Sequence, residues 1–162
     1  MKIAATGHRP PRLGLDYSTQ SRKRLFCFVA DYLEGLGEVT LITGGAQGFD
    51  QAVAHAAQIL GLPYIMAVPF DGQESKWPEE AKRFYRDLVA SAQSVYVVSP
   101  GGYANWKFIA RDKWMVDNAD MIIALRDSKP EKSGTGITVD YAQKQGKTVV
   151  NLWDDWVNFR DR

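Results

Sequence analysis

Short apolar runs alternate with segments of helical periodicity along the chain, and this alternation constrains the fold more than any other feature. The runs are rich in Val, Ile and Tyr and continuous, which is typical of strands buried on both faces of a parallel sheet. They cover Ile3–Thr6, Val39–Thr43, Tyr64–Val68, Val95–Ser99, Met121–Leu125 and Thr148–Leu152. We therefore expect about six strands, each separated from the next by a helix.

The intervening segments carry apolar residues on one helical face. They cover Ser18–Glu34, Phe49–Leu60, Pro78–Ala92, Asn105–Asn118 and Ile137–Gln145, and a last short helix is expected within Trp153–Arg162. Strict alternation predicts an α/β fold with a doubly wound, mainly parallel sheet and helices on both faces.

Length and composition limit the class of protein. At 162 residues the chain fits one domain, which we place at residues 1–162. The formal net charge is only +1, and this argues against a dedicated nucleic-acid partner. The single cysteine, Cys27, excludes an internal disulfide and a Cys-rich zinc site, and its helix face predicts a core position.

No metal and no cofactor are expected. The chain has no apolar run of membrane-spanning length and no signal-peptide pattern at its start, so we expect no membrane partner and a cytoplasmic location.

Glycine and small hydroxyl residues follow one predicted strand after another. Because the carboxyl ends of parallel strands meet at one edge of a sheet, these loops should form a common ligand site there. The residues expected to contact a ligand are Thr6, Gly7, His8, Arg9, Thr43, Gly44, Gly45, Gln47, Gly48, Asp50, Pro69, Ser99, Gly101, Tyr103, Lys107, Arg111, Gly134, Thr135 and Thr138.

The chemistry of this set favours a phosphate. Glycine lets a backbone approach a ligand closely, and helix N-termini attract anions. The run Thr43–Asp50 is neither a dinucleotide fingerprint nor a P-loop, so it is a weak signal by itself. The Arg9 guanidinium can form two hydrogen bonds with a phosphate. An arginine in a solvent-exposed loop would look the same in the sequence, so this alternative stays open.

Two carboxylates are candidates for catalysis, Asp50 and Asp140, both near the start of a predicted helix. Each could act as a general acid or base, or accept hydrogen bonds from a ribose; each could also simply stabilise its helix dipole. His55 lies within an Ala-rich helix and is expected to be structural. Trp77, Tyr103 or Trp106 could stack on a base, although aromatic residues are more often core.

Several motifs in register resemble the SLOG superfamily of Rossmann-like domains, named for Smf/DprA and LOG, and most of all its YpsA-like branch. They are Thr6–Pro10, Ile42–Asp50, Val68–Phe70 with Gln73, Trp77–Pro78, Gly101–Tyr103, Trp114–Asp120, Gly134–Thr135 and Val139–Ala142. The resemblance implies a Rossmann-like pocket for a nucleotide or a nucleotide-derived ligand such as an ADP-ribose derivative. It also implies a possible homodimer, since relatives often pair.

Relatives of this kind differ in function, so three alternatives stand. The first is a sensor or sequestering protein that only binds. The second is an N-glycosidase (phosphoribohydrolase) acting on a nucleoside monophosphate, like the LOG enzymes with their P-G-G-x-G-T-x-x-E run. In this chain the leading Pro-Gly is absent and Asp140 stands roughly where the Glu would be. The third, DNA binding, suits the neutral charge least.

The net charge conceals an asymmetry. Residues 1–24 carry six basic side chains against Asp16 alone, a balance of +5, and the remainder carries −4. We therefore expect a basic corner beside the glycine-lined edge, suited to a small polyanion.

Overall fold

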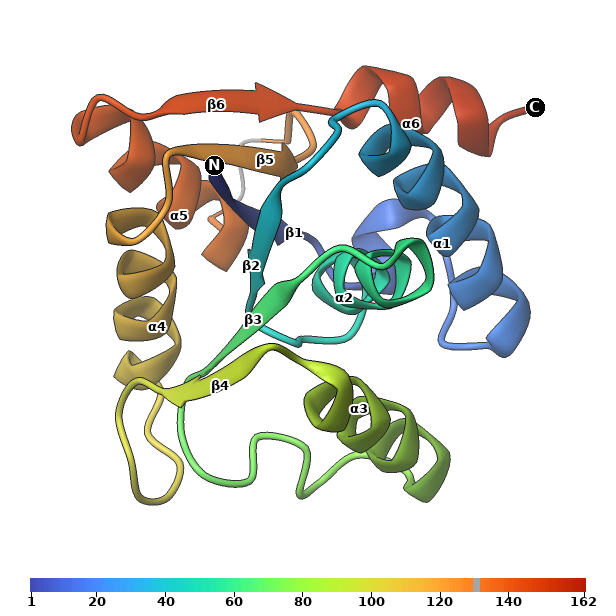
Figure 1. Ribbon diagram of the computed structural model, residues 1–162. Helices are drawn as coiled ribbons and strands as arrows, with labels where there is room; N and C mark the ends of the chain where they lie inside the picture. Colours follow the sequence, from blue (N-terminus) through green and yellow to red (C-terminus); the bar gives the residue numbers. More distant parts are fainter. Residues whose placement is uncertain (130–131) are drawn as a thin grey trace.

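One parallel sheet organises the protein. The computed structural model describes residues 1–129 and 132–162, and in this part of the chain six strands form one sheet of order β4-β3-β2-β1-β5-β6 (Figure 1). Every neighbouring pair is parallel. The strands are β1 (Lys2–Gly7), β2 (Thr40–Thr43), β3 (Tyr64–Val68), β4 (Ser94–Val97), β5 (Met121–Leu125) and β6 (Thr148–Asn151). The predicted doubly wound α/β fold is confirmed.

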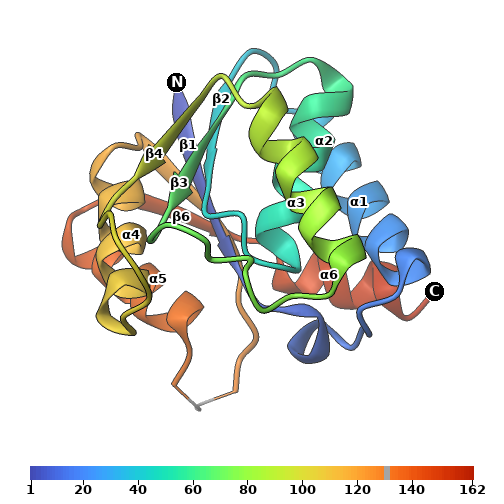
Figure 2. The same ribbon diagram turned by 90° about the horizontal axis from the view of Figure 1, so that it is seen from below.

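The helices form a layer on each face of the sheet. They are α1 (Thr19–Glu34), α2 (Phe49–Leu60), α3 (Glu79–Ser91), α4 (Trp106–Asp117), α5 (Gly134–Lys144) and α6 (Trp153–Arg160), with a 3-10 turn at Pro10–Leu13. Figure 2 shows α4 and α5 on one side and the other four on the opposite side. Each layer covers its own apolar core, because successive side chains of a strand point to opposite faces.

The two cores differ in size. In β1, Ile3 and Ala5 enter the larger core under α1, α2, α3 and α6, whereas Ala4 enters the smaller one under α4 and α5. Trp156 of α6 is fully buried in the larger core, and its Nε1–H donates to the Leu13 carbonyl at 3.1 Å. The expected C-terminal helix is therefore confirmed as a packed element.

Helix boundaries follow local capping chemistry. Ser18 caps α1 by accepting a hydrogen bond from the Ser21 N–H. Gly61 ends α2 in the left-handed conformation, with φ +72°. The helix predicted over Ile137–Gln145 begins earlier, at Gly134, because Ser133 caps it by accepting from the Gly136 N–H at 2.9 Å.

Two expectations about burial are wrong. The runs that form β4 and β6 are edge strands and remain partly exposed; Val95 and Tyr96 are 42% and 48% exposed. Cys27 is exposed rather than buried, because it lies on the outer face of α1, away from Leu25, Phe28 and Val29. Continuity of an apolar run therefore did not distinguish an edge strand from a central one.

The direction of winding changes beside β1. The chain moves outward from β1 through β2 and β3 to β4, and then crosses back through α4 to β5 on the other side of β1. In open α/β sheets the crevice at such a switch point, at the carboxyl ends of the strands, is where ligands bind. This geometry selects the carboxyl ends of β1 and β5 as the place to look for a site.

Candidate functional site

A cavity of about 420 Å³ opens at the carboxyl end of β1. Its walls come from β1 and the following turn, the start of α2, one face of α4, and the start of α5. The residues that line it are Thr6, Gly7, His8, Arg9, Pro11, Arg12, Tyr17, Ala46, Asp50, Phe108, Arg111, Asp112, Ser133, Gly134 and Thr135. We call it the switch-point pocket.

Eight of the residues expected at a ligand site line this pocket: Thr6, Gly7, His8, Arg9, Asp50, Arg111, Gly134 and Thr135. They come from four segments far apart in the sequence. Arg9 is exposed and, among the described residues, its side chain takes part in no hydrogen bond or ion pair. Its guanidinium is therefore available to a ligand.

Several of the predicted ligand glycines are required by the protein's own packing. A Cβ on Gly7 would lie 2.5 Å from Phe49, and one on Gly44 would lie 2.4 Å from Arg111 Nη1. A Cβ on Gly48 would lie 2.6 Å from the His8 carbonyl oxygen, and its φ is +103°. These glycines let α2 and Arg111 approach the strands, and the structure gives them this role without a ligand.

Gly45, Gln47 and Thr43 also lie outside the pocket. Gly45 has φ +73° and faces Met66 and Tyr85. Thr43 is fully buried, and its Oγ1 donates to the Asp50 carbonyl at 2.7 Å. Gln47 and Gly48 line a separate cleft of about 30 Å³, which is smaller than any nucleotide.

The predicted residues around β3, β4 and α4 form a second group away from the pocket. The Ser99 N–H donates to the Pro69 carbonyl at 3.2 Å. Lys107 Nζ donates to the carbonyls of Pro100 and Gly102, and so closes the loop that contains Gly101. Tyr103 is 71% exposed and contacts Phe70 edge-on.

The two candidate carboxylates differ sharply. Asp140 is exposed, lies outside the pocket lining and pairs with Arg126 at 3.1 Å. Asp50 is 8% exposed and lines the pocket. Burial is the main reason that the pKa of Asp50 is raised to about 7; Asp112 also raises it, whereas Arg111 and Arg9 favour the charged form and limit the rise. Asp50 can therefore exchange a proton near neutral pH.

A buried polar wall on α4 supports the pocket. Arg111 is 4% exposed; its Nη1 donates to the Gly44 carbonyl at 2.7 Å and the Ala67 carbonyl at 3.1 Å. Asp112 accepts from Arg111 Nε at 2.7 Å and from the Thr138 hydroxyl at 3.0 Å. Thr138 thus acts on the pocket through Asp112. Sequence reasoning missed Asp112, although it directly follows a predicted site residue.

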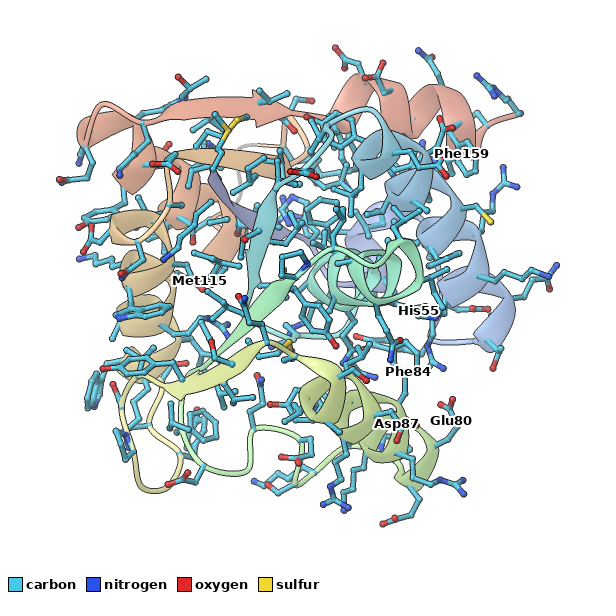
Figure 3. The ribbon with its side chains drawn as sticks, viewed as in Figure 1. His55, Glu80, Phe84, Asp87, Met115 and Phe159 are labelled. Carbon is cyan, nitrogen blue, oxygen red and sulfur yellow. The ribbon has the colours of Figure 1, made fainter. Side chains whose placement is uncertain are left out.

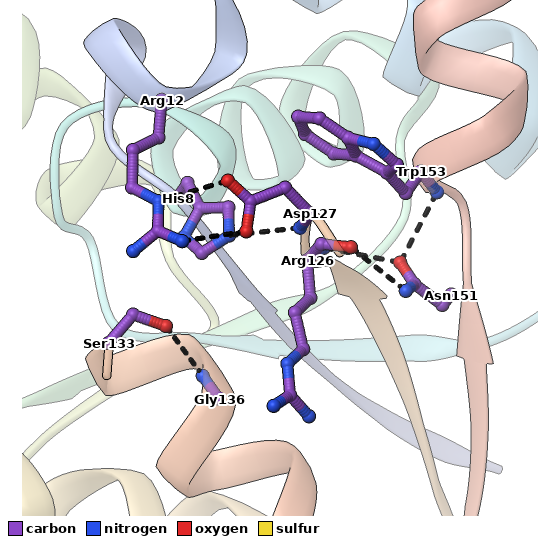
Figure 4. A network of polar contacts seen from close by, with 8 residues as sticks. All are labelled: His8, Arg12, Arg126, Asp127, Ser133, Gly136, Asn151 and Trp153. Atoms are coloured by element: carbon purple, nitrogen blue, oxygen red, sulfur yellow. Dashed lines mark hydrogen bonds and ion pairs between the residues drawn. The ribbon is translucent and has the colours of Figure 1, made fainter. Parts of the chain in front are cut away.

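A second polar network joins the loops after β1 and β5 (Figure 4). Arg12 donates to both oxygens of Asp127, with Nη2 at 2.7 Å and Nε at 3.1 Å. The Asp127 N–H donates to His8 Nε2 at 3.0 Å, so that nitrogen is unprotonated. Burial lowers the pKa of His8, which keeps the imidazole neutral. Asp127 is the central residue of this network, and the sequence analysis did not single it out.

The start of α5 contributes backbone donors. Gly134 and Thr135 occupy its first two positions, where N–H groups have no partner within a helix. Both residues line the pocket, and a Cβ on Gly134 would meet nothing within 4 Å. Here, unlike at Gly7 or Gly48, the space beside a predicted ligand glycine is open.

The remaining candidates from the sequence lie elsewhere. His55 of α2 packs between Phe26 of α1 and Phe84 of α3, and its buried Nδ1 has no hydrogen-bond partner among the described residues. Figure 3 shows His55 beside Phe84. Trp77 contacts Tyr85 edge-on, and Trp106 is 61% exposed. None of these aromatic rings lines the switch-point pocket.

Several of the basic side chains that were expected to form a basic corner instead interact with other parts of the protein. Arg22 pairs with Glu80 at 2.7 Å and lies over the Phe84 ring. Arg24 donates to the carbonyls of Phe159 and Arg160 at the end of α6. Arg9 and Arg12 are the basic residues of the first 24 that line the pocket.

Across residues 1–129 and 132–162, no group of three or more His, Cys, Asp or Glu side chains could hold a metal ion. In the same ranges no helix has the length and apolarity needed to span a membrane.

The fold is that of a Rossmann-like protein, and a pocket lies at the switch point of its sheet. The chain matches the model of the YspA SLOG family over residues 3–154, and it belongs to this family. Membership confirms the resemblance stated from the sequence motifs.

Similar sequences come from bacilli. The chain is 29% identical over 139 residues to the uncharacterized SPbeta prophage-derived protein YoqJ of Bacillus subtilis (strain 168), covering 76% of this chain and 80% of that protein. It is 30% identical over 147 residues to a UPF0398 protein of Bacillus pumilus (strain SAFR-032), covering 82% and 76%.

Solved structures share the fold. DNA processing protein A (DprA) of Streptococcus pneumoniae superposes with a TM-score of 0.63 at 23% identity, over 91% of this chain but only 48% of that one. TM1055 superposes at 0.61 and 14% identity, over 95% and 78%. DprA of Helicobacter pylori, described for its single-stranded DNA binding mode, superposes at 0.61 and 21% identity, over 92% and 63%. At these identities the likeness shows the fold alone.

Proposed function

We propose that the protein binds a nucleotide or a nucleotide-derived ligand, such as an ADP-ribose derivative, in the switch-point pocket, as a sensor or a sequestering protein. The observation that carries the proposal is the meeting of the unpaired Arg9 with the open N-terminus of α5 in one cavity. A guanidinium and helix N–H groups are complementary to a phosphate. A volume of about 420 Å³ is in the range of small-molecule sites.

The polar wall suits the remainder of such a ligand. Thr6 and Asp112 offer a hydroxyl and a carboxylate that can hydrogen-bond to ribose hydroxyls, and Phe108 offers an apolar surface. Arg111 and Asp112 are held by hydrogen bonds before any ligand arrives. Preorganised side chains of this kind lower the entropic cost of binding.

Isothermal titration calorimetry with nucleoside mono- and diphosphates, NAD and ADP-ribose tests the proposal. We expect at least one to bind, and we expect Arg9→Ala to weaken that binding by at least about tenfold, since a charge-assisted hydrogen bond contributes about 1.5–3 kcal/mol. Arg86→Ala is the matched control, because Arg86 lies on α3, outside the pocket. Absence of binding by every compound, with the protein folded, would refute the proposal.

An N-glycosidase acting on a nucleoside monophosphate is the second candidate, and Asp50 favours it. A carboxyl with a pKa of about 7 inside the pocket suits a general acid or base at neutral pH. Asp140, the other candidate, is exposed and paired with Arg126, so we assign catalysis to Asp50 in this alternative.

A base-release assay over a panel of nucleotides separates the two candidates. Under the glycosidase proposal, Asp50→Asn lowers base release by at least about 100-fold, and Asp140→Asn leaves it within about twofold, a difference below 0.5 kcal/mol. Release that survives Asp50→Asn unchanged contradicts the assignment. If no nucleotide releases its base but at least one binds, only the binding function remains.

DNA binding is a third candidate function, and evidence for it would replace the small ligand with DNA in the proposal. A formal net charge of +1 and a basic N-terminal segment engaged in internal pairs argue against a polymer of phosphates. We expect no shift of single-stranded DNA in a gel at low salt. A shift that Arg9→Ala abolishes would instead assign the pocket to DNA.

A further inference from the structure

An uncharged stretch of chain reaches the surface at one edge of the sheet. From Leu88 to Trp106 there is no Asp, Glu, Lys, Arg or His, although charged residues make up 24% of the sequence. The stretch contains β4 and the loop before α4. Four large apolar side chains in it are exposed: Val95 at 42%, Tyr96 at 48%, Tyr103 at 71% and Trp106 at 61%.

The outer edge of β4 has no partner within the described chain. In the part of the chain that the structure describes, β4 is the last strand on its side of the sheet and pairs only with β3 (Figure 1). In a parallel ladder alternate residues direct their N–H and C=O groups away from the neighbour. Soluble proteins usually protect such an edge with Lys, Pro or a bulge, and Ser94–Val97 contains neither Lys nor Pro.

We propose that β4 is a self-association surface, on which a second copy of this chain pairs antiparallel through a two-fold axis to continue the sheet. The occupant follows from the charges. Across a two-fold axis each surface meets itself, so any net charge would face the same charge. A strand and loop without charged residues bring no such repulsion of their own, and the exposed Val95 and Tyr96 gain burial.

The symmetry specifies the contact further. A two-fold axis perpendicular to the sheet keeps each side chain on the same face as its copy, and side chains alternate between faces along a strand. One residue must therefore lie directly opposite its own copy. In the four-residue strand Ser94–Val97 the central positions are Val95 and Tyr96, so the axis passes beside one of them. Tyr96 is already held by stacking on Trp114 at 4.7 Å between ring centroids.

Sedimentation velocity over a concentration series tests the proposal. We expect the 18.1 kDa chain to reach a dimer mass by about 100 μM, a concentration at which even modest affinities populate the complex. Val95→Lys and Tyr96→Lys should each weaken association by at least about fivefold, because each places a charge in a contact that has none, and at the axial position the two like charges face each other directly. Ile59→Lys is the matched control: Ile59 is 62% exposed but lies on α2.

A mixing experiment identifies the axis and guards against misfolded variants. At the axial position, an equimolar mixture of the Lys and Glu variants should associate more strongly than either variant alone, because opposite charges then meet. We expect stronger association of the mixture at one of the two positions, Val95 or Tyr96. The far-ultraviolet circular dichroism of each variant should match that of the wild type, which shows that the variants are folded. A monomer at all concentrations, or two mixtures that never exceed their components, overturns the proposal; so does an equal effect of Ile59→Lys.

Discussion

The carboxyl group of Asp50 is buried beside two arginines and a second carboxylate, and its proton is held more tightly in the folded protein than in the unfolded chain. Its ordinary pKa is 3.8, and burial raises the pKa to about 7. Between these values the folded state binds a proton that the unfolded state has released. The free energy of unfolding should therefore fall as the pH rises from about 4 to about 7, and Asp50 contributes no further change above that.

Asp50→Asn should remove this pH dependence. Measured by urea unfolding, the variant's free energy of unfolding minus that of the wild type should rise between pH 4 and pH 7 by up to roughly 4 kcal/mol, the value that corresponds to about three pKa units. Asp140→Asn is the control, since Asp140 is 59% exposed in its pair with Arg126. Parallel curves for wild type and Asp50→Asn would show that Asp50 titrates normally.

For individual residues, the sequence predicted which polar side chains lie at the pocket better than it predicted what each glycine does. Thr6, His8 and Arg9 were expected at the pocket because they directly follow a central strand, and the structure brings them there. The contribution of a glycine depends on what faces it across the fold. Gly44 faces Arg111, 67 positions later in the sequence, and no local pattern contains that contact.

Among the elements, α2 begins directly against the turn after β1, where the Phe49 N–H donates to the His8 carbonyl, and Gly48 makes this contact possible. Gly48→Ala should cost about 2–5 kcal/mol, because a Cβ would lie 2.6 Å from the His8 carbonyl and φ is +103°. Gly61→Ala, at the other end of the same helix, should cost only about 1–2 kcal/mol, since its Cβ meets nothing within 4 Å. Equal costs in thermal unfolding would contradict this explanation.

The ion pair between Arg12 and Asp127 ties the turn after β1 to the end of β5. Asp127→Asn should lower the free energy of unfolding by about 1.5–3 kcal/mol, because two charge-assisted hydrogen bonds weaken while the backbone bond to His8 remains. Asp161→Asn removes the exposed pair with Arg160 and should cost clearly less, because solvent screens an exposed ion pair. Urea denaturation of both variants measures the difference.

Element types and order were predictable because apolar periodicity is a local property. The bounds of α2 match the predicted Phe49–Leu60, where a glycine lies on each side of the helix. The early start of α5 was missed because glycine and threonine disfavour helix interiors, although Ser133 provides a cap. The exposure of β4 was not predictable, since strand order within the sheet depends on long-range connections.

For the whole molecule, the distribution of charge has a different meaning in the folded protein than along the sequence. The excess of +5 in residues 1–24 suggested a basic corner. Folding brings acidic partners from α3 and the β5 loop to Arg22 and Arg12, and leaves Arg9 exposed beside the pocket. A linear count of charge therefore overstated the positive field at the site.

The two layers of helices contribute unequally to stability. The core beneath α1, α2, α3 and α6 contains most of the buried large side chains, whereas α4 and α5 cover a much smaller one. Hydrogen exchange monitored by mass spectrometry should show faster exchange in α4 and α5 than in α2, because less apolar burial opposes local opening. Uniform protection across the helices would contradict this expectation.

This inequality has a consequence for how such a pocket can diverge. Asp50 stands on α2, in the layer that covers the larger core, so changes there endanger folding itself. Phe108, Asp112 and Gly134 belong to the layer of α4 and α5, which covers the smaller core. Substitutions there should lower the free energy of unfolding less. A lineage descended from this chain could therefore exchange one ligand for another by altering α4 and α5, while the opposite wall is inherited unchanged.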